Sequence, residues 1–468
     1  MERVLPKTLD YTDVLPLAVE SRSRRRTFFP VNGASFKSDG ANIIRIDLSA
    51  DALLDTQHSY LRFDFTPTYT GQSCGIDTAG GHAFIRRMRV EQSGTVLEDI
   101  NNYNRLMGGV VLPCQSGQDH RNERSVTEHI RAVGETSARA ATNVQTQYQA
   151  FAGVPTDGDT ALAVGGHHQL ATQVPSGTAV TFAIPLNTGL LNCDKLVPLM
   201  LMSAPLTIEI ELANTIQPVC WSGAAPTNYS IDNVRYIANL IEVGQDVAGQ
   251  LRMVQEMSGG VLTLAGQTYR HFTGSITNTT GDQVINVPAR VKSMKSMFFV
   301  SSGATPEGAQ TFDVSFGGNM SLNEYQIKIG SVVYPPTPIK CGFGDGDADD
   351  GGVVFARSEA LMELAKAWGN VGSTKGLGQL NSTNYAVSKS TKATSTNPEI
   401  VYSPFGMDLE AFQRVAIESG VNTADRSLPI SLVLGFSTAP ADGTQVEVFV
   451  LADALFYING DGSMSVSV

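Results

Sequence analysis

The segment LTIEIELA, residues 206–213, carries a leucine or isoleucine at every second position and a threonine or glutamate between them. Successive side chains of a β-strand point to opposite faces, so this pattern predicts a strand with one apolar and one polar face. An apolar sheet face must be buried against another layer of structure. The segment therefore indicates a layered β architecture.

The same period of two recurs along most of the chain. Residues 44–49 and 61–65 alternate in this way, and residues 84–100 do so on both sides of Gln92-Ser93-Gly94, which predicts a hairpin whose turn uses the glycine. In that hairpin Met88 and Val90 share one face. The strand pattern is also expected to resume at Val180. Further strands are predicted at 229–243, 261–264, 271–277, 284–287, 296–300, 312–316, 325–329, 430–436 and 446–458.

A short helix separates two strand-rich halves of this 468-residue chain. It is predicted to be capped by Asp246, to carry Val247, Leu251 and Val254 on one stripe, and to end before Gly259-Gly260. Each half also contains a long stretch of weak periodicity, at 113–173 and 341–404, and a second helix is predicted at 358–368. The repeated arrangement predicts an all-β protein made of two sandwiches.

The tract SRSRRRTFFP, residues 21–30, raises the question of nucleic-acid binding. The whole chain has 33 basic and 45 acidic residues, a formal net charge of −12, which opposes general binding to a phosphate backbone. The tract is therefore interpreted either as a local arm that reaches a polyanion or as a solvated terminus.

The composition of the chain restricts the cellular compartment of the protein and the state of its cysteines. No run of 18 apolar residues is present, and the first residues lack the apolar core of a signal peptide, so a soluble protein made in a cytoplasm is expected. The five cysteines are scattered and are expected to be buried thiols in a reducing compartment. They are Cys74, Cys114, Cys193, Cys220 and Cys341.

Several motifs only partly match functional sites. GDGDADDGG (344–352) spaces its first aspartates like a calcium loop, but Asp350 stands at the glycine position and Ala356 at the glutamate position. A solvated acidic turn or a weak calcium site at 345–350 are the alternatives. GNVGSTKGLG (369–378) lacks the order of a phosphate loop, and His167-His168 has no ligand partner at the required spacing. We therefore expect no catalytic residues, no cofactor, no metal site and no small-molecule substrate.

Four segments resemble a known family, the double jelly-roll major capsid proteins of icosahedral double-stranded DNA viruses. This lineage includes tectiviruses, adenoviruses, virophages, polinton-like viruses and nucleocytoplasmic large DNA viruses. The similar segments are GGHAFIRRMRVEQSGTVLEDINNYNRL (80–106), IPLNTGLLNCDKLVPLMLMSAPLTIEIELA (184–213), IANLIEVGQDVAGQLRMVQEM (237–257) and VEVFVLADALFYINGDGSMSVSV (446–468). Residues 184–187 lack the tryptophan-rich string of the giant-virus members, which favours a smaller virus or a phage.

The resemblance implies two tandem eight-stranded jelly rolls with a few short helices and long loops. The implied division is an N-terminal arm at 1–40, a first jelly roll at 41–245, a linker helix at 246–260 and a second jelly roll at 261–468. It further implies homotrimers with a pseudo-hexagonal outline that tile an icosahedral shell, and a protein located in the virion capsid after assembly inside the host cell.

The same resemblance gives the basic tract a role. The arm would lie on the inner side of the shell, with Phe28 and Phe29 docked under a jelly roll. Its arginines would meet a minor capsid protein, an internal membrane or the packaged genome, in that order of preference. These arginines are Arg22, Arg24, Arg25 and Arg26. Neighbouring capsomers and the penton protein are the other implied partners. The alternative function is a carbohydrate-binding fibre or spike protein, which would require exposed aromatic side chains beside carboxylates, and the chain has only Trp221 and Trp368.

Overall fold

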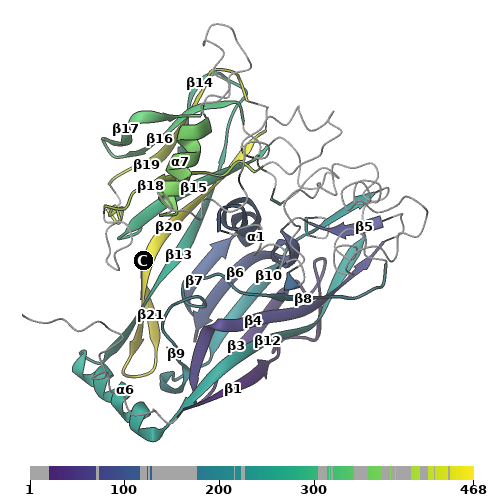
Figure 1. Ribbon diagram of the computed structural model, residues 1–468, viewed down its shortest axis with the longest axis vertical. Coiled ribbons are helices and arrows are strands. Elements are labelled where there is room, and N and C mark those ends of the chain that lie inside the picture. Colours follow the sequence, from purple (N-terminus) through teal and green to yellow (C-terminus); the bar gives the residue numbers. More distant parts are fainter. Residues whose placement is uncertain are drawn as a thin grey trace, which may run out of the picture.

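A computed structural model gives the fold of the chain (Figure 1). The residues that it describes are 21–69, 73–77, 79–115, 124, 127–128, 176–214, 217–222, 227–303, 314–315, 317, 320–341, 357–369, 380, 385, 402–411, 420–425, 427–440 and 443–468. The predicted acidic loop, His167-His168 and most of both long excursions lie outside these residues, and so do most residues of the glycine-rich segment 369–378.

The first half of the chain forms two antiparallel sheets. One sheet has the order β1-β12-β4-β8 and the other has the order β3-β10-β6-β7. The eight strands are β1 (Ser21–Phe28), β3 (Ile43–Leu48), β4 (Leu53–Thr68), β6 (Ile85–Gln92), β7 (Thr95–Asn101), β8 (Val180–Ile184), β10 (Leu206–Leu212) and β12 (Asn228–Val243). The short strands β2 (Ser35–Lys37) and β9 (Val197–Pro198) extend the first sheet, and β5 (Ser73–Ile76) pairs with β11 (Val219–Ser222).

The second half repeats this arrangement. Its sheets have the orders β13-β20-β15-β18 and β14-β19-β16-β17, and β21 (Met464–Ser467) pairs with β20. The strands are β13 (Val261–Ser275), β14 (Gly281–Asn286), β15 (Met294–Gly303), β16 (Leu322–Ile329), β17 (Val332–Lys340), β18 (Phe405–Asp408), β19 (Ile430–Phe436) and β20 (Gln445–Asn459).

The two halves have the same topology. When the eight main strands of each half are counted in chain order, one sheet reads 1-8-3-6 and the other reads 2-7-4-5 in both halves. In this order the chain passes from one sheet to the other at every step except the hairpin between strands 4 and 5, which is the order of a jelly roll. The predicted fold class, two tandem eight-stranded jelly rolls, is confirmed.

The basic tract is the first strand of the first jelly roll and not part of a separate arm. β1 pairs with β12 over its whole length, from Ser21 opposite Val243 to Phe28 opposite Tyr236. The boundary predicted at residue 41 therefore falls too late. The sequence concealed this strand because Ser21 to Arg26 are exposed, so the tract has no apolar face to produce a period of two.

The local patterns that predicted most of the strands match the structure. The strand predicted at 312–316 does not, because its described residues, Val314 and Ser315, lie in a turn. Every leucine and isoleucine of LTIEIELA is buried in β10. The β6–β7 hairpin turns at Ser93 and Gly94, both with positive φ, and buries Met88 and Val90. Four phenylalanines pack together inside the first jelly roll, with 5.1 Å between the ring centroids of Phe63 and Phe182.

Along the chain, the helices of the described residues lie mainly between the sheets. The inter-barrel helix α6 spans Gln245–Met257, and α7 spans Arg357–Ala367 within the second excursion. A continuous helical segment runs through α1 (Tyr103–Arg105), a π-helical turn at Leu106–Val111 and α2 (Leu112–Gln115). Among the described residues, no helix combines the length and the apolar character needed to cross a membrane.

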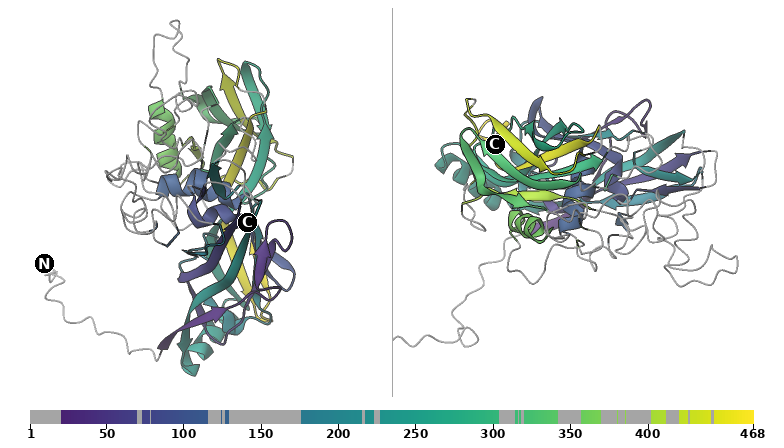
Figure 2. Two further views of the ribbon diagram at one scale, coloured as in Figure 1. Left: turned by 90° about the vertical axis from the view of Figure 1, so that its right-hand side faces the viewer. Right: turned by 90° about the horizontal axis from the view of Figure 1, so that it is seen from above.

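Buried side chains of the two jelly rolls form one continuous hydrophobic cluster. Figures 1 and 2 show how the two jelly rolls are arranged. In Figure 1 the second jelly roll lies above the first, with α1 between them, and the long strands β13 and β20 descend beside the first jelly roll towards α6. Strand β13 of the second jelly roll packs against β7 of the first. This packing forms the junction that the next section describes.

Candidate functional site

The arginines of β1 lie on an edge strand and have partners on neighbouring strands. Arg24 Nη1 lies 3.2 Å from Glu242 Oε1, and Arg25 Nη2 donates to the Tyr60 hydroxyl at 3.3 Å. The guanidinium of Arg26 lies 4.8 Å from the centre of the Phe28 ring. Arg22 is also exposed. The tract is thus a basic surface stripe of a folded sheet.

The two phenylalanines after the arginines have different environments. Phe28 is 7% exposed and belongs to the hydrophobic core, whereas Phe29 is 61% exposed. The guanidinium of Arg235 lies 5.8 Å from the centre of the Phe29 ring. Adjacent residues of an extended chain face opposite ways, so only one of the pair can enter the jelly roll.

The other charged sheet surface is neutralised by ion pairs. Arg45 Nη2 lies 2.6 Å from Glu209 Oε2, and Arg89 bridges Glu209 at 3.5 Å and Glu91 at 3.1 Å. These residues line the outer face of β3, β10 and β6. Acidic partners between the arginines make this face a poor phosphate-binding surface and suit it to water or to another protein surface.

Side chains of the first jelly roll hold the backbone of the second at their junction. Gln92 is 2% exposed; its Nε2 donates to Gly462 O at 3.1 Å and its Oε1 accepts from Met464 N–H at 2.6 Å. Arg105, also buried, donates to Val314 O at 2.6 Å and to Ser301 O at 3.2 Å. Buried polar groups with such partners fix one relative arrangement of the two bodies.

A buried ion pair lies at the same junction. His271 of β13 pairs with Glu447 of β20, and Asn102 Nδ2 of the first jelly roll donates to Glu447 Oε2 at 3.2 Å. Thr273 Oγ1 donates to the same oxygen at 2.9 Å. Burial opposes ionisation of Glu447, but its hydrogen bond with His271 and the nearby positive charges outweigh burial and lower its pKa.

Backbone segments of the two jelly rolls approach closely beside this pair. A Cβ on Gly189 would lie 2.7 Å from Gln267 O, so only glycine fits. The buried carboxylate of Glu98 accepts from the N–H groups of Gly189 and Leu190, each at 2.8 Å. Burial raises the pKa of Glu98 despite these hydrogen bonds. Glu98 therefore fixes the loop that touches β13.

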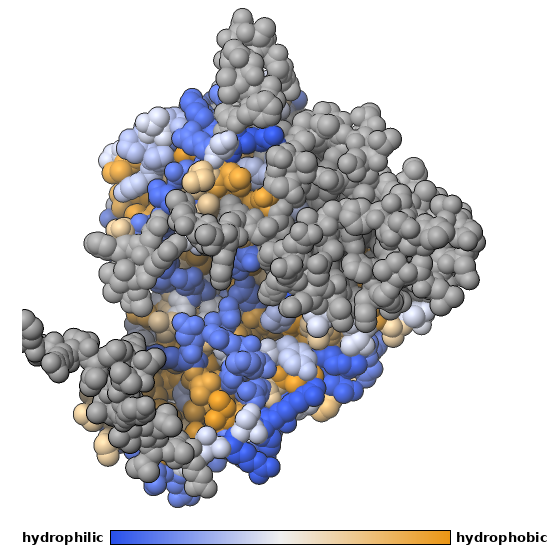
Figure 3. Space-filling view, viewed as in Figure 1, coloured by the Kyte–Doolittle hydropathy of each residue, from blue (hydrophilic) through white to orange (hydrophobic). Residues whose placement is uncertain are grey.

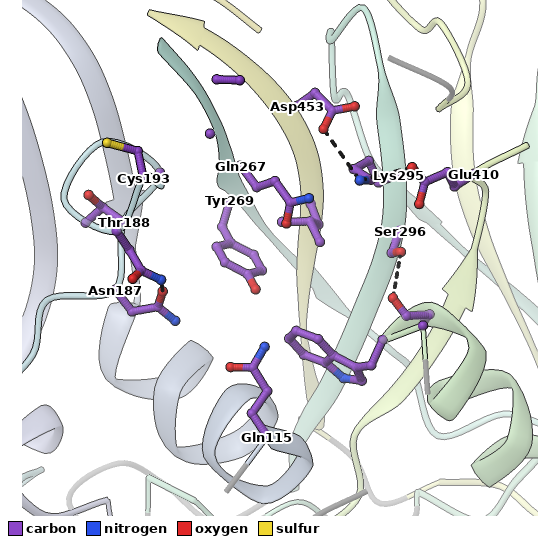
Figure 4. A pocket seen from close by; sticks show the side chains of 18 of the residues that line it. Gln115, Asn187, Thr188, Cys193, Gln267, Tyr269, Lys295, Ser296, Glu410 and Asp453 are labelled. Atoms are coloured by element: carbon purple, nitrogen blue, oxygen red, sulfur yellow. Dashed lines mark hydrogen bonds and ion pairs between the residues drawn. The ribbon is translucent and has the colours of Figure 1, made fainter. Parts of the chain in front are cut away.

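A cleft of about 700 Å³ opens between the jelly rolls (Figure 4). Asn187 and Thr188 lie on one side of it, and Lys295 and Ser296 lie on the other. Lys295 Nζ lies 3.0 Å from Glu410 Oε1 and 3.6 Å from Asp453 Oδ1. Cys193 also lines the cleft, and burial raises the pKa of its thiol, which disfavours a reactive thiolate.

One residue of the first excursion is anchored inside the first jelly roll. Glu128 is buried, and its carboxylate contacts His82 Nε2 at 2.9 Å and Arg124 Nη2 at 2.6 Å. Its backbone oxygen accepts from Gly81 N–H at 2.7 Å. Burial raises the pKa of Glu128, but His82 and Arg124 together lower it more. The contact fixes Glu128 against the segment Gly81–His82 of the first jelly roll.

The described residues contain no cluster of three histidine, cysteine or acidic side chains suited to a metal ion. The described cysteines whose side chains are placed, Cys114, Cys193 and Cys341, are buried free thiols, as expected. The acidic loop 345–350 and His167-His168 lie outside the described residues.

Sequence reasoning missed the polar residues of the junction. One signal was available, because Gln92 follows Met88 and Val90 on the inward face of β6. A polar side chain in an apolar phase requires a buried partner. No comparable signal marks His271 and Glu447, which lie 176 residues apart in the sequence.

Among the comparisons with known proteins, only the comparison of three-dimensional structures gave matches. No protein-family model matches the sequence, and no curated protein matches it.

The structure, in contrast, resembles solved structures over its whole length. The capsid of the virus PBCV-1 matches with a TM-score of 0.58 at 10% identity, covering 98% of this chain and 99% of that one. The Faustovirus major capsid protein matches with 0.51 at 9% identity, covering 98% and 93%. The mavirus major capsid protein matches with 0.50 at 11% identity, covering 100% and 96%. The chain therefore has the fold of these proteins, as its sequence resemblance implied.

Proposed function

We propose that this chain is a major capsid protein that forms pseudo-hexagonal homotrimers and tiles the icosahedral shell of a double-stranded DNA virus. The observation that carries the proposal is the match of both jelly rolls together, over at least 98% of this chain, to three structures titled as a viral capsid or major capsid proteins. A match to one jelly roll alone would carry far less, because single jelly rolls serve many functions.

The junction between the jelly rolls supports a building-block role. Gln92, Arg105 and Asn102 bind partners in the other jelly roll, so the two bodies present a fixed outline. A lattice requires such an outline, because each copy must meet its neighbours in the same geometry. A low content of charged residues, 17% of the chain, also suits surfaces that other subunits cover.

The basic stripe on β1 is proposed to face the interior of the shell. Its partners would be an acidic minor capsid protein first, then the anionic headgroups of an internal membrane, then the packaged genome. Arg22, Arg24, Arg25 and Arg26 are exposed and can contribute guanidinium groups to any of these. Phe29, which is also exposed, can add apolar contact, whereas Phe28 is already used by the core.

Two measurements test the shell proposal. Light scattering of the purified protein should give three times the mass of the 49.9 kDa chain, and electron microscopy of the source particles should show regular shells that contain this chain. Neighbouring capsomers and the penton protein would then be its partners in the virion, after assembly inside the host cell. A stable monomer that binds glycans on an array and never forms shells would instead favour the fibre or spike function.

The basic stripe has its own test. Replacing Arg22, Arg24, Arg25 and Arg26 by glutamine should leave trimers soluble and reduce the yield of complete particles at least several-fold. A matched variant with four lysines keeps the charge and should retain most of the yield if charge alone is required. Equal particle yields from the glutamine variant and the wild type would refute an inner-surface role for these residues.

A further inference from the structure

The inter-barrel helix α6 leaves an apolar face uncovered. Met253 is 60% exposed, Val254 49% and Met257 82%, and Gln255 is the buried residue of the helix. Gln255 Nε2 donates to Ile458 O at 3.0 Å and so fixes the helix to β20. Exposed, flexible methionine side chains adapt to a partner surface. Apolar and strongly hydrophilic surfaces lie side by side at this lower end of the molecule (Figure 3).

A groove of about 650 Å³ adjoins this face. Val254 of α6 lines it together with Val261 and Leu262 of β13 and Tyr457 of β20. Ser258, Thr263, Asn459 and Ser465 add polar groups to the described lining, and Lys195 is its charged residue. The groove therefore combines apolar and polar surface with one positive charge. An extended apolar segment with acidic residues would suit it in shape and charge.

The chain itself carries such a segment directly beside the groove. Ser21 is paired with Val243, two residues before the first residue of α6, so residues 1–20 join the fold next to this helix. Twenty extended residues reach up to about 66–72 Å, and a 13-residue helix is about 20 Å long. The segment can therefore reach any part of the groove of its own chain.

The sequence of this segment also fits the groove. MERVLPKTLDYTDVLPLAVE contains the tripeptide Val-Leu-Pro twice, at 4–6 and 14–16. A residue before proline is disfavoured in helical conformations, so Leu5 and Leu15 favour an extended backbone. The segment has four acidic residues (Glu2, Asp10, Asp13, Glu20) and two basic residues (Arg3, Lys7), which complements Lys195.

We infer that the groove between α6 and the ends of β13 and β20 is the binding site for residues 1–20 of the same chain, held through the two Val-Leu-Pro units. Tethering beside the groove raises the effective concentration of the segment to the millimolar range, which favours its own chain over a second copy. The inference is independent of the proposed capsid role.

Binding of a labelled peptide with the sequence of residues 1–20 tests this, by fluorescence anisotropy with the full-length protein. In the wild type the tethered segment competes with the peptide. In a Leu5→Asp/Leu15→Asp variant the tethered segment is disabled, and the peptide should bind at least tenfold more tightly. Adding Val254→Asp to that variant should abolish binding, because Val254 lines the groove and the new charge would lie in it. Adding Met362→Asp instead, at a 54% exposed methionine of α7, should leave it unchanged.

The outcomes against the inference are distinct. Equal affinity for the wild type and the Leu5→Asp/Leu15→Asp variant would exclude occupation of the groove by its own chain. If residues 1–20 of the wild type compete with the peptide only at high protein concentration, the groove binds this segment from a second copy. Binding of anionic vesicles that Val254→Asp weakens, without any binding of the peptide, would assign the face to a lipid surface. Each of these results overturns the inference.

Discussion

The side-chain amide of Gln92 in the first jelly roll binds the backbone N–H of Met464 in the second, at 2.6 Å and across 372 residues of sequence. Its Nε2 donates to Gly462 O in the same turn and to Ala204 O in the first jelly roll. One buried side chain therefore connects the turn before β21 to the end of β6.

Replacing this side chain should loosen the connection. Gln92→Ala leaves the N–H of Met464 and the carbonyl of Gly462 without this partner, which should cost about 1–3 kcal/mol of unfolding free energy. Urea unfolding followed by circular dichroism measures the change. Gln250→Ala, at an exposed position of α6, is the matched control and should shift stability by less than about 0.5 kcal/mol. Similar midpoints for both variants would contradict a bridging role for Gln92.

The contact between Gly189 and β13 leads to a second prediction. In Gly189→Ala the new Cβ would meet Gln267 O at 2.7 Å and Glu98 Oε1 at 2.9 Å, so the loop must move and stability should fall by about 1–3 kcal/mol. Gly249 lies inside α6 with open space around it, so Gly249→Ala should instead stabilise the protein by about 0.5–1 kcal/mol. Thermal unfolding of both variants checks the opposite signs.

The His271–Glu447 pair makes the stability of the folded protein depend on pH in the acidic range. The pKa of Glu447 in the folded protein lies below its ordinary value of 4.5, so its ionised form contributes stability that is complete above that pH. The contribution is lost as the pH falls from 4.5 through the lower folded pKa. Asn102, Thr273 and Arg105 are the other polar groups that act on this carboxylate.

Glu447→Gln removes the titrating group and tests this dependence. The variant should be less stable than the wild type at pH 7, by about 1–3 kcal/mol, and the difference should shrink as the pH falls below 4.5. Urea midpoints at pH 7, 5 and 3.5 give the two profiles. Profiles that stay parallel across this range would show that the pair contributes no acid-dependent stability.

Adjacent phenylalanines provide a comparison of core and surface. Phe28→Ala removes a ring from the core of the first jelly roll and should cost about 3–5 kcal/mol. Phe29→Ala removes a 61% exposed ring and should change stability by less than about 0.5 kcal/mol. If Phe29 contacts a partner in the shell, only its variant should combine normal stability with impaired particle assembly.

The position of β1 determines which truncation is informative. Deleting residues 1–30 removes all eight residues of an edge strand and the core residue Phe28, so this truncated protein should unfold or aggregate. Deleting residues 1–20 leaves β1 intact and should retain soluble trimers. Size-exclusion chromatography with light scattering separates the two outcomes, and soluble protein from the longer deletion would show that β1 is dispensable.

The sequence determined most strands because the period of two is a local property. The segment 206–213 predicts its own buried face, and Gly94 predicts the β6–β7 turn, without knowledge of any partner. Helix α6 was predicted close to its observed bounds, because its apolar stripe and the two following glycines are also local. Its cap was not, because Gly244 precedes the helix and Asp246 lies in its first turn. The resemblance of four segments to the double jelly-roll capsid proteins then predicted that two jelly rolls follow each other along the chain.

Tertiary structure decided what depends on distant partners. The SRSRRRTF tract is a strand only because β12 supplies hydrogen bonds from residues that are more than 200 positions away. Glu447 is a buried anion only because His271 and Asn102 meet it at the junction. Pairing across such separations is set by the packing of whole sheets, and the periodicity of one segment does not identify its partner.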